Sequence, residues 1–329
     1  MSFVAVLVAL ILEQARPLTQ GAWLQAGPRR WVRMAGRNLD AGLSHHAWLA
    51  WSVAVVPWVV LAVALHHLLW WVHPMFAFVW NIAVLYLTLG FRQFSHHFTA
   101  IRDALELGDE ALARSELARW QRVDAAALPR GELVRHVIEY SVLAAHRHVF
   151  GVLAWYCVLA AFGLGPAGAV IYRLSDYAFR YWTYKSRQIG EAVSPALVRA
   201  ADRAWGLIDY LPSRATAVAF AIVGSFEEAV DSWRQCHVGM AAADSSRVQR
   251  NEATVVAATA GALNVQLGGA QLRSMSADAA QSLEPSAFMA TVGRPPESAH
   301  LRSVVGLVWR AVVLWIVMLA LLTLARLLG

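Results

Sequence analysis

Lysine is almost missing from this sequence, and charged residues of every kind are scarce. Lys185 is the only lysine in the 329 residues, so positive charge rests on arginine. Charged residues make up 15% of the chain, against about 25% in ordinary soluble domains. Together with 58% hydrophobic residues and a mean hydropathy of +0.46, this composition excludes an ordinary soluble domain and indicates an integral membrane protein.

Cysteine and the short catalytic motifs are also scarce or missing. Cys157 and Cys236 are the only cysteines, too few for a disulfide framework or a cysteine-based zinc site. The sequence contains no Walker-type glycine loop, no Gly-x-Ser-x-Gly elbow and no His-Glu-x-x-His pair. Any chemistry must therefore come from residues that are distant in sequence.

The net charge of +6 does not indicate a nucleic-acid partner. No aromatic RNA-binding motif and no zinc-finger spacing accompanies the arginines. Fifteen tryptophans match the aromatic enrichment at bilayer interfaces, and arginine-rich loops are typical of the cytoplasmic side of a membrane. The bilayer itself is the partner that the composition predicts.

Long apolar runs predict where the chain crosses the membrane. Residues 48–72 and 74–90 form two such runs joined at His73-Pro74, which predicts an antiparallel helical hairpin. A third run starts at Val149, and 303–328 predicts a C-terminal transmembrane helix. The apolar start of the chain lacks a positive leader and a cleavage site, so we interpret it as a retained short helix.

Charge placement predicts the orientation. The arginine-rich stretch 14–47 is assigned to the cytoplasm, and one hairpin later 92–147 returns to the same side. Its charges are spread at helical spacing, which predicts an amphipathic helical hairpin on the membrane surface. Residues 172–213 are arginine-rich again. The sequence GLGPAG at 163–168 reconciles this with a third run at 149–171, because a helix broken there can re-enter on the same side.

The predicted fold class is therefore an all-α integral membrane protein, a multi-span helical bundle with a cytoplasmic amphipathic hairpin and a broken, re-entrant helix. We expect one domain over 1–329, with 92–147 as a helical insertion. The expected location is the bacterial inner membrane, with several passes.

Several motifs resemble those of the CobD/CbiB family of membrane proteins and occur in the same order along the chain. They are GFRQFSHHFTAIRDALELGDEALAR at 90–114, RHVIEYS at 135–141, VIYRLSDYAFRYWTYKS at 170–186, LIDYLPSRATAVAFAIVGSFEEA at 207–229 and RNEATVVAATAGALNVQLGGA at 250–270. Together they cover most of the chain. The resemblance implies adenosylcobinamide-phosphate synthase activity, which joins aminopropanol phosphate to adenosylcobyric acid, and it also takes in AmpE, a membrane protein associated with β-lactamase induction.

The departures from the family pattern concern acidic and amide groups. The opening Gly-Asp-Pro pattern of the enzymes is replaced by LILEQARPLTQ, and a Glu-Asn pair and an aspartate are missing where AAHRHVFG stands. Magnesium prefers carboxylate and amide oxygens, whereas arginine suits phosphate or carboxylate. We therefore expect an AmpE-like regulatory or ligand-binding protein in envelope signalling, with an anionic small molecule or a membrane or cytoplasmic protein as partner. The alternative is the synthase, with ATP and magnesium.

We expect a set of ligand-binding residues, some that match the family pattern and some that stand where the sequence departs from it, while catalytic residues stay unassigned. The set is Arg92, Arg135, Glu139, His146, Arg147, Arg173, Asp176, Tyr184, Arg214 and Asn251. We expect seven of them to converge on a polar cavity near the cytoplasmic membrane face, namely Arg92, Arg135, Glu139, Arg147, Arg173, Arg214 and Asn251. The competing interpretation is ion-paired packing with nothing bound.

His146, Arg147 and His148 stand directly before the third apolar run and permit three interpretations. They form a polar collar at the headgroups, or a polar pocket at the membrane edge, or a metal site together with His96 and His97. Histidines two positions apart on a helix point about 200° apart around its axis, which argues against chelation from one face. No metal site is assigned.

Thiol labelling tests the predicted topology. With Cys157 and Cys236 replaced by alanine, the substitution Asp109→Cys should create a thiol that reagents reach from the cytoplasmic side, because 92–147 is predicted to lie there. Labelling of inside-out and right-side-out vesicles measures this. Reactivity only from the periplasmic side would contradict the assignment.

Overall fold

The computed structural model describes residues 2–15, 23–121, 124–187, 193–242, 245–269 and 290–328, and for 2, 23–25, 91–94, 241–242 and 326–328 it describes the backbone alone. These residues are almost entirely helical. Their regular structure besides helices is one isolated bridge between Val265 and Arg294. The helices are α1 (Ser2–Ala15), α2 (Trp23–Leu39), α3 (Ser44–Val72), α4 (Pro74–Thr88), α5 (Phe91–Glu106), α6 (Glu110–Gln121), α7 (Arg130–Ala145), the π-helix η1 (His146–Phe150), α8 (Gly151–Ala161), α9 (Ala167–Ser186), α10 (Pro195–Ile208), α11 (Tyr210–Val223), α12 (Phe226–Ala242), α13 (Arg247–Leu263) and α14 (Ser298–Leu328).

The chain forms two compact units, each assembled from separate segments. Unit 1 comprises Met1–Gln93, Arg147–Pro212 and Trp315–Gly329, and unit 2 comprises Phe94–His146 and Ser213–Leu314. The expectation of a single domain over 1–329 stays a prediction. The all-α membrane fold is confirmed.

Within the described part of the chain, three helices are long and apolar enough to cross a membrane, Ser44–Val72, Arg130–Ala161 and Ser298–Ala325. The first and the last agree with the predicted spans. The apolar helices α10 and α11, which meet at Asp209, make up a fourth candidate. The orientation of these helices in a bilayer stays a prediction.

Helix α3 has the dimensions of a membrane span. Trp48 lies near its start and Trp70 near its end, 22 residues apart, which at 1.5 Å per residue is about 33 Å. The hydrocarbon core of a bilayer is about 30 Å thick, so the two tryptophans are spaced as interfacial anchors.

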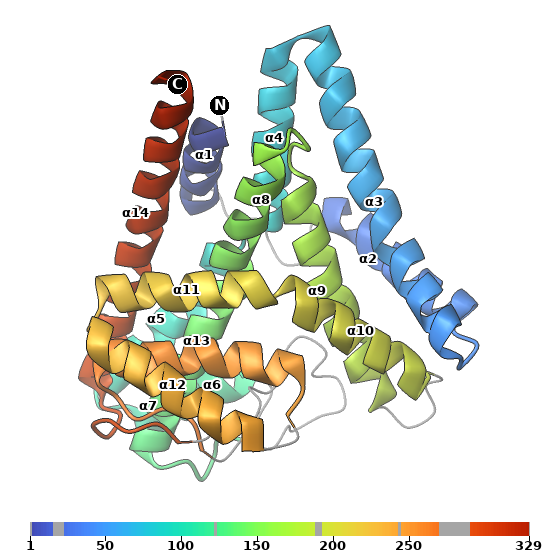
Figure 1. Cartoon of the computed structure of the whole chain (residues 1–329). Helices are drawn as coiled ribbons and strands as arrows, with labels where there is room; N and C mark the ends of the chain where they lie inside the picture. The colour runs from blue at the N-terminus through green and yellow to red at the C-terminus, as the bar shows by residue number, and fades with distance from the viewer. Residues whose placement is uncertain are drawn as a thin grey trace. The chain divides into compact units, whose positions relative to one another are not determined.

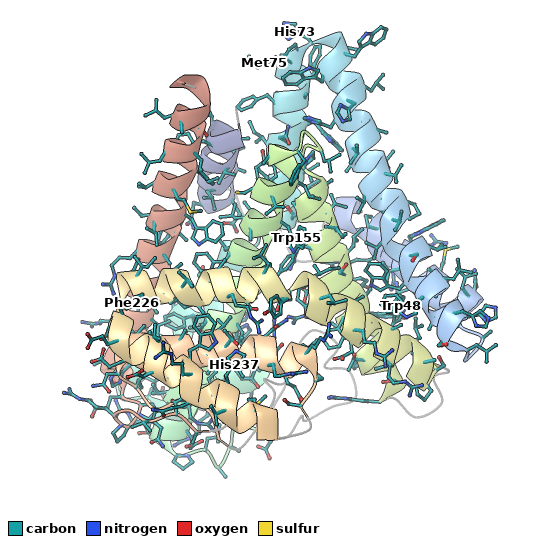
Figure 2. The ribbon with its side chains drawn as sticks, in the orientation of Figure 1. Trp48, His73, Met75, Trp155, Phe226 and His237 are labelled. Carbon is teal, nitrogen blue, oxygen red and sulfur yellow. The ribbon has the colours of Figure 1, made fainter. Side chains whose placement is uncertain are left out.

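The hairpin predicted at His73-Pro74 is present, but its second helix is shorter than predicted. His73 has an extended backbone and its Nδ1 accepts a hydrogen bond from the Met75 amide at 3.2 Å, so it ends α3 and caps α4. Figure 2 shows His73 and Met75 at the tip of this hairpin. Helix α4 ends at Thr88 after 15 residues, fewer than the roughly 20 that a span needs.

The segment 92–147 differs from the predicted surface hairpin at its C-terminal end. Helices α5 and α6 agree with the prediction, but α7 is mostly buried and continues through η1 into α8, as one helix from Arg130 to Ala161. The third apolar helix therefore begins 19 residues before Val149, the predicted start. Charged residues on α7 misled the prediction, because they are paired inside the protein rather than exposed.

The break predicted at GLGPAG is confirmed. Helix α8 ends at Ala161 and α9 begins at Ala167, and Gly163 and Gly165 between them have φ of 78° and 57°. Glycine adopts such positive φ values at no steric cost. Helices α8 and α9 then pack side by side as a hairpin (Figure 1).

Small residues let this hairpin close tightly. A Cβ added at Gly168 would lie 1.9 Å from the carbonyl oxygen of Trp155, and one at Gly151 would lie 2.0 Å from the Tyr172 hydroxyl. His66 of α3 lies against the turn at Gly165 and is 3.3 Å from the Asn81 side chain of α4. Histidine side chains in membrane bundles form such hydrogen bonds between helices.

Unit 2 contains a second tight helix pair. Helices α12 and α13 pack together, and a Cβ at Gly261 would lie 2.1 Å from the backbone oxygen of Glu228. Helix α13 starts with a capping box of Ser246 and Gln249 and ends at Asn264, whose left-handed backbone closes the helix. Helix α13 also packs on α7, which brings the segment after Asn264 to the charged residues of α7.

The substitution Gly168→Ala should destabilise the protein by about 3 kcal/mol, because the new methyl group meets a backbone carbonyl and overpacking a rigid site costs this much. Gly306→Ala in α14 is the matched control, since nothing lies within 4 Å of its added Cβ, and alanine favours a helix by about 1 kcal/mol over glycine. Thermal unfolding in detergent measures both changes. Pro166→Ala should be tolerated better than Gly168→Ala. Equal melting temperatures for Gly168→Ala and Gly306→Ala would contradict the close approach of Gly168 to the Trp155 carbonyl.

Candidate functional site

Three polar side chains of α7 and the backbone of Gly268 form a buried group in unit 2 that we name the Gly268 cluster; the side chains are those of Arg135, His136 and Glu139. The Arg135 guanidinium donates to Glu139 at 3.1 Å and to the Gly268 carbonyl at 2.7 Å, and the Gly268 amide donates to the same Glu139 carboxylate at 2.7 Å. Arg135 is 4% exposed and Glu139 2%. The pair therefore holds a backbone segment 129 residues further along the chain.

The backbone at residues 268 and 269 of unit 2 favours glycine. Gly268 and Gly269 have φ of 84° and 111°, values that residues with a side chain rarely adopt. An added Cβ at Gly269 would contact the Arg135 guanidinium at 3.7 Å. Arg135 also donates to Glu132 at 2.5 Å, at the exposed edge of the cluster.

A second polar group of unit 2, the Arg214 cluster, joins the starts of α11 and α13 with α12. Arg214 donates to the side-chain oxygen of Asn251 and, at 2.9 Å, to Ser213. Partial burial lowers the pKa of His237, and the positive charges of Arg214 and Arg250 lower it further. His237 therefore lies in a region of positive potential; Figure 2 shows it on α12. Cations grouped around a neutral amide suit an anionic ligand.

The α9 cluster of unit 1 consists of Arg147, His148, Arg173, Asp176 and Arg180. Asp176 accepts hydrogen bonds from Arg180 at 2.6 Å and from Arg173 at 3.4 Å. Arg147 and His148 of η1 lie close enough to interact electrostatically with Asp176. The cluster is mostly buried, with Asp176 5% exposed.

A pair beside the α9 cluster links α9 to the end of α10. The Tyr172 hydroxyl donates to Asp209 at 2.8 Å, and the Tyr172 ring lies 4.9 Å from the Trp205 ring. Trp155 of α8 donates to the backbone oxygen of Ile208 at 2.7 Å. The contacts of Tyr172 hold α9 against the end of α10, one residue before Arg173.

The structure divides the predicted ligand-binding residues between the two units. Unit 2 holds the pairs Arg135–Glu139 and Arg214–Asn251, and His146, whose Nδ1 lies 2.9 Å from the Thr216 hydroxyl. In unit 1, Arg147, Arg173 and Asp176 lie together. Tyr184 also lies in α9 and has the Lys185 ammonium 5.9 Å from its ring. Arg92 lies in α5 and its side chain is outside the described residues, so convergence of all seven residues stays a prediction.

Metal ligation finds no support among the described side chains, where no three His, Cys, Asp or Glu residues are grouped to hold an ion. His97 pairs instead with Glu116 at 3.8 Å and stacks on Trp120. His146 and His148 lie in the π-helix η1, with His146 directed to Thr216.

The sequence analysis did not select Arg180, Asp209 and Gly268, which make contacts in or beside these clusters. A signal existed for Arg180, which is four residues after Asp176, the spacing of a helical ion pair. Asp209 and Gly268 contact residues 37 and 129 positions away, and no local pattern announces such contacts.

Comparison with known proteins gives one consistent result. The family model described as CobD/Cbib protein matches residues 4–308. The chain is 30% identical over 326 residues to the "Cobalamin biosynthesis protein CobD" of Stutzerimonas stutzeri, covering 96% of each protein. It is 32% identical over 218 residues to the protein of the same name from Chromobacterium violaceum, covering 66% of this chain and 63% of that protein. No solved structure matches.

The Gly268 cluster predicts a large difference between the two carboxylate partners of Arg135. Glu139→Ala should destabilise the protein by about 3–5 kcal/mol, because it leaves a buried guanidinium without its buried counter-charge. Glu132→Ala is the matched control and should cost no more than about 1 kcal/mol, since Glu132 is half exposed. Denaturant unfolding in detergent measures both. A similar loss in the two variants would show that Glu139 does not hold the buried charge.

Proposed function

The chain belongs to the CobD/CbiB family of membrane proteins, and from this membership we propose that it acts in cobalamin biosynthesis as a cobinamide-phosphate synthase. The observation that supports this most is the match to the Stutzerimonas stutzeri protein, which extends over 96% of both chains. A match of this length leaves no large segment of either protein unaccounted for. The proposed location is the bacterial inner membrane.

The proposed reaction forms an amide. The amino nitrogen of aminopropanol phosphate bonds to a carboxyl carbon of adenosylcobyric acid, and one carboxylate oxygen leaves. We propose that ATP phosphorylates this oxygen, so that it leaves as phosphate while ATP becomes ADP and the amine releases its protons. The protein must then hold an amine, a carboxylate and phosphate groups in reacting positions, which is the main contribution expected in such a transfer.

Arginine is the residue most suited to these anionic groups, and we propose the Arg214 cluster for the substrate phosphate. Arg214 and Arg250 lie close to His237 and bring two guanidinium groups to one region of unit 2. Arginine binds phosphate through two parallel hydrogen bonds. Asn251 accepts from Arg214, which orients the guanidinium.

The buried carboxylates in and beside the Gly268 and α9 clusters do not fit a magnesium ion held by the protein. Glu139 accepts from Arg135 and the Gly268 amide, Asp176 from two arginines and Asp209 from Tyr172. Magnesium takes one or two carboxylates together with substrate phosphates and water. Under this proposal magnesium enters with the nucleotide as part of the substrate, and no step is assigned to a resident ion.

The names of the relatives favour the synthase over the AmpE-like role in envelope signalling. Both relatives described above carry the name of a cobalamin biosynthesis protein. The absence of the Glu-Asn and Gly-Asp-Pro motifs is the observation that favours a regulatory role. These motifs would supply oxygen ligands for a metal ion, and their absence does not affect the arginines. The synthase is therefore the proposal, and an anionic small molecule is its expected ligand.

Complementation tests the proposal. In a bacterial strain that lacks the cobinamide-phosphate synthase, the wild-type gene should restore growth that depends on cobalamin made from adenosylcobyric acid. Arg214→Gln should lower the rate of cobinamide-phosphate formation about 10-fold or more, since a hydrogen bond to a charged group contributes about 1.5–3 kcal/mol. Arg119→Gln, at a side chain 66% exposed, is the control and should leave the rate unchanged. No growth with a wild-type protein that is present in the membrane would refute the proposal.

A further inference from the structure

We propose that helix α2 of unit 1 is an interfacial helix whose exposed side binds the negatively charged headgroups of anionic phospholipids. The proposal goes beyond cobinamide-phosphate synthesis, because it assigns a class of lipid to a surface rather than a substrate to a site. Two features of α2 support it, an exposed row of arginines with an apolar border and a hydrogen bond that fixes the depth of the helix. Helices α2 and α3 lie side by side (Figure 1).

The exposed side of α2 divides lengthwise into a cationic half and an apolar half. Arg30, Arg33 and Arg37, which we name the arginine row, are exposed and lie within about 60° of one another around the helix axis. Trp31 and Met34, 38% and 44% exposed, lie about 100° and about 40° from Arg30 on the other half. Positive charge beside exposed indole and thioether groups is typical of helices that lie in the plane of a membrane interface.

The opposite side of α2 is covered by unit 1. Val32 is 0% exposed and Ala35 6%, and a Cβ added at Gly36 would meet the Trp182 indole of α9. Helix α2 therefore cannot turn its arginine row toward the protein without losing this packing. The row is presented outward by the fold.

The charge of the arginine row is not balanced by α2 itself. The helix contains no Asp or Glu. The next acid along the chain, Asp40, accepts from the Ser194 amide at 2.7 Å and from the Ser194 hydroxyl, where α10 begins. In the described part of the chain, no carboxylate forms an ion pair with the three arginines of the row. The row is therefore available to an anionic partner.

A hydrogen bond from Trp31 fixes the depth of α2. Pro57 lies inside α3 and has no amide hydrogen, so the carbonyl four residues earlier, that of Val53, lacks its helical donor. The Trp31 indole N–H donates to this carbonyl at 2.7 Å and replaces the missing amide. Val53 is five residues after Trp48, about 7.5 Å along the helix axis. Interfacial helices lie about 5–10 Å into the boundary between headgroups and acyl chains, so this bond holds α2 at the depth of the headgroups.

The occupant that fits this surface is an anionic phospholipid. Helix α2 belongs to the stretch 14–47 that is predicted to be cytoplasmic, and anionic lipids give the cytoplasmic leaflet a negative surface potential. A soluble polyanion would neutralise the arginine row but leave Trp31 and Met34 in water. A lipid supplies both the negative headgroup and the acyl chains that cover these two side chains.

Lipid competition tests the proposal. For the purified full-length protein in neutral detergent with equal concentrations of phosphatidylglycerol and phosphatidylcholine, native mass spectrometry should detect more protein bound to phosphatidylglycerol. Arg30→Gln combined with Arg37→Gln should lower this preference about fivefold or more, because one arginine near an anionic surface contributes a factor of about five.

Arg119→Gln combined with Arg302→Gln is the matched control. It also removes two exposed arginines, 66% and 71% exposed, but each of these is paired with a carboxylate, so the preference should change by less than about twofold. Equal binding of the two lipids by the wild type, or an equal fall in preference in the two double variants, would overturn the proposal. These outcomes do not depend on the synthase reaction, since no substrate is present.

A double-mutant cycle tests the depth of α2. Trp31→Phe keeps an aromatic ring but removes the indole N–H, so it should lower the melting temperature by leaving the Val53 carbonyl without a donor. In the Pro57→Ala background the alanine amide can donate to that carbonyl, and Trp31→Phe should then lower the melting temperature much less. The same decrease in both backgrounds would show that this bond does not hold α2, and it would overturn the placement of the arginine row at the headgroups.

Discussion

A guanidinium group withdrawn from water into an apolar helical bundle is stable only where carboxylate or carbonyl oxygens replace the water that it loses. Arg135 illustrates the constraint. Its partners are Glu139, one helical turn away, and the Gly268 carbonyl, which belongs to a segment that leaves α13 far along the chain. Satisfying one buried charge thus fixes where that segment lies on α7. The α7 helix can be long, buried and charged at once because its charges are paired internally.

The same constraint explains why some features could be predicted from sequence and others could not. Apolar length predicts α3 and α14, and the glycines and proline of GLGPAG predict the turn between α8 and α9, because lipid exposure and backbone sterics act locally. The start of the third apolar helix was misplaced, since Arg135 and Glu139 look like surface charges when their partners are unknown. Asp209 and Gly268 depend on contacts across 37 and 129 residues, and periodicity carries no information on them.

The motif that carries much of the family resemblance has a structural explanation. In GALNVQLGG, Asn264 ends α13 in the left-handed conformation, and Gly268 and Gly269 adopt positive φ where the backbone meets Arg135 and Glu139. Side chains at these glycines would be strained. The motif therefore maintains the contact between α13 and α7, and its presence indicates a shared fold more directly than a shared reaction.

The reaction has to be argued from the charged groups instead. One of the departures from the family pattern, the missing Glu-Asn pair and aspartate, falls around His146–Phe150, where the helix widens into a π turn, a feature that often accompanies functional sites. There the Nδ1 of His146 lies 2.9 Å from the Thr216 hydroxyl in unit 2, while Arg147 places a positive charge near Asp176 in unit 1. Under the proposed function, an arginine in place of oxygen ligands at this turn would favour an anion over a metal ion. A synthase whose magnesium enters on nucleotide phosphates can accept that change, because its protein has only to hold the phosphates, and arginine does so without a resident metal.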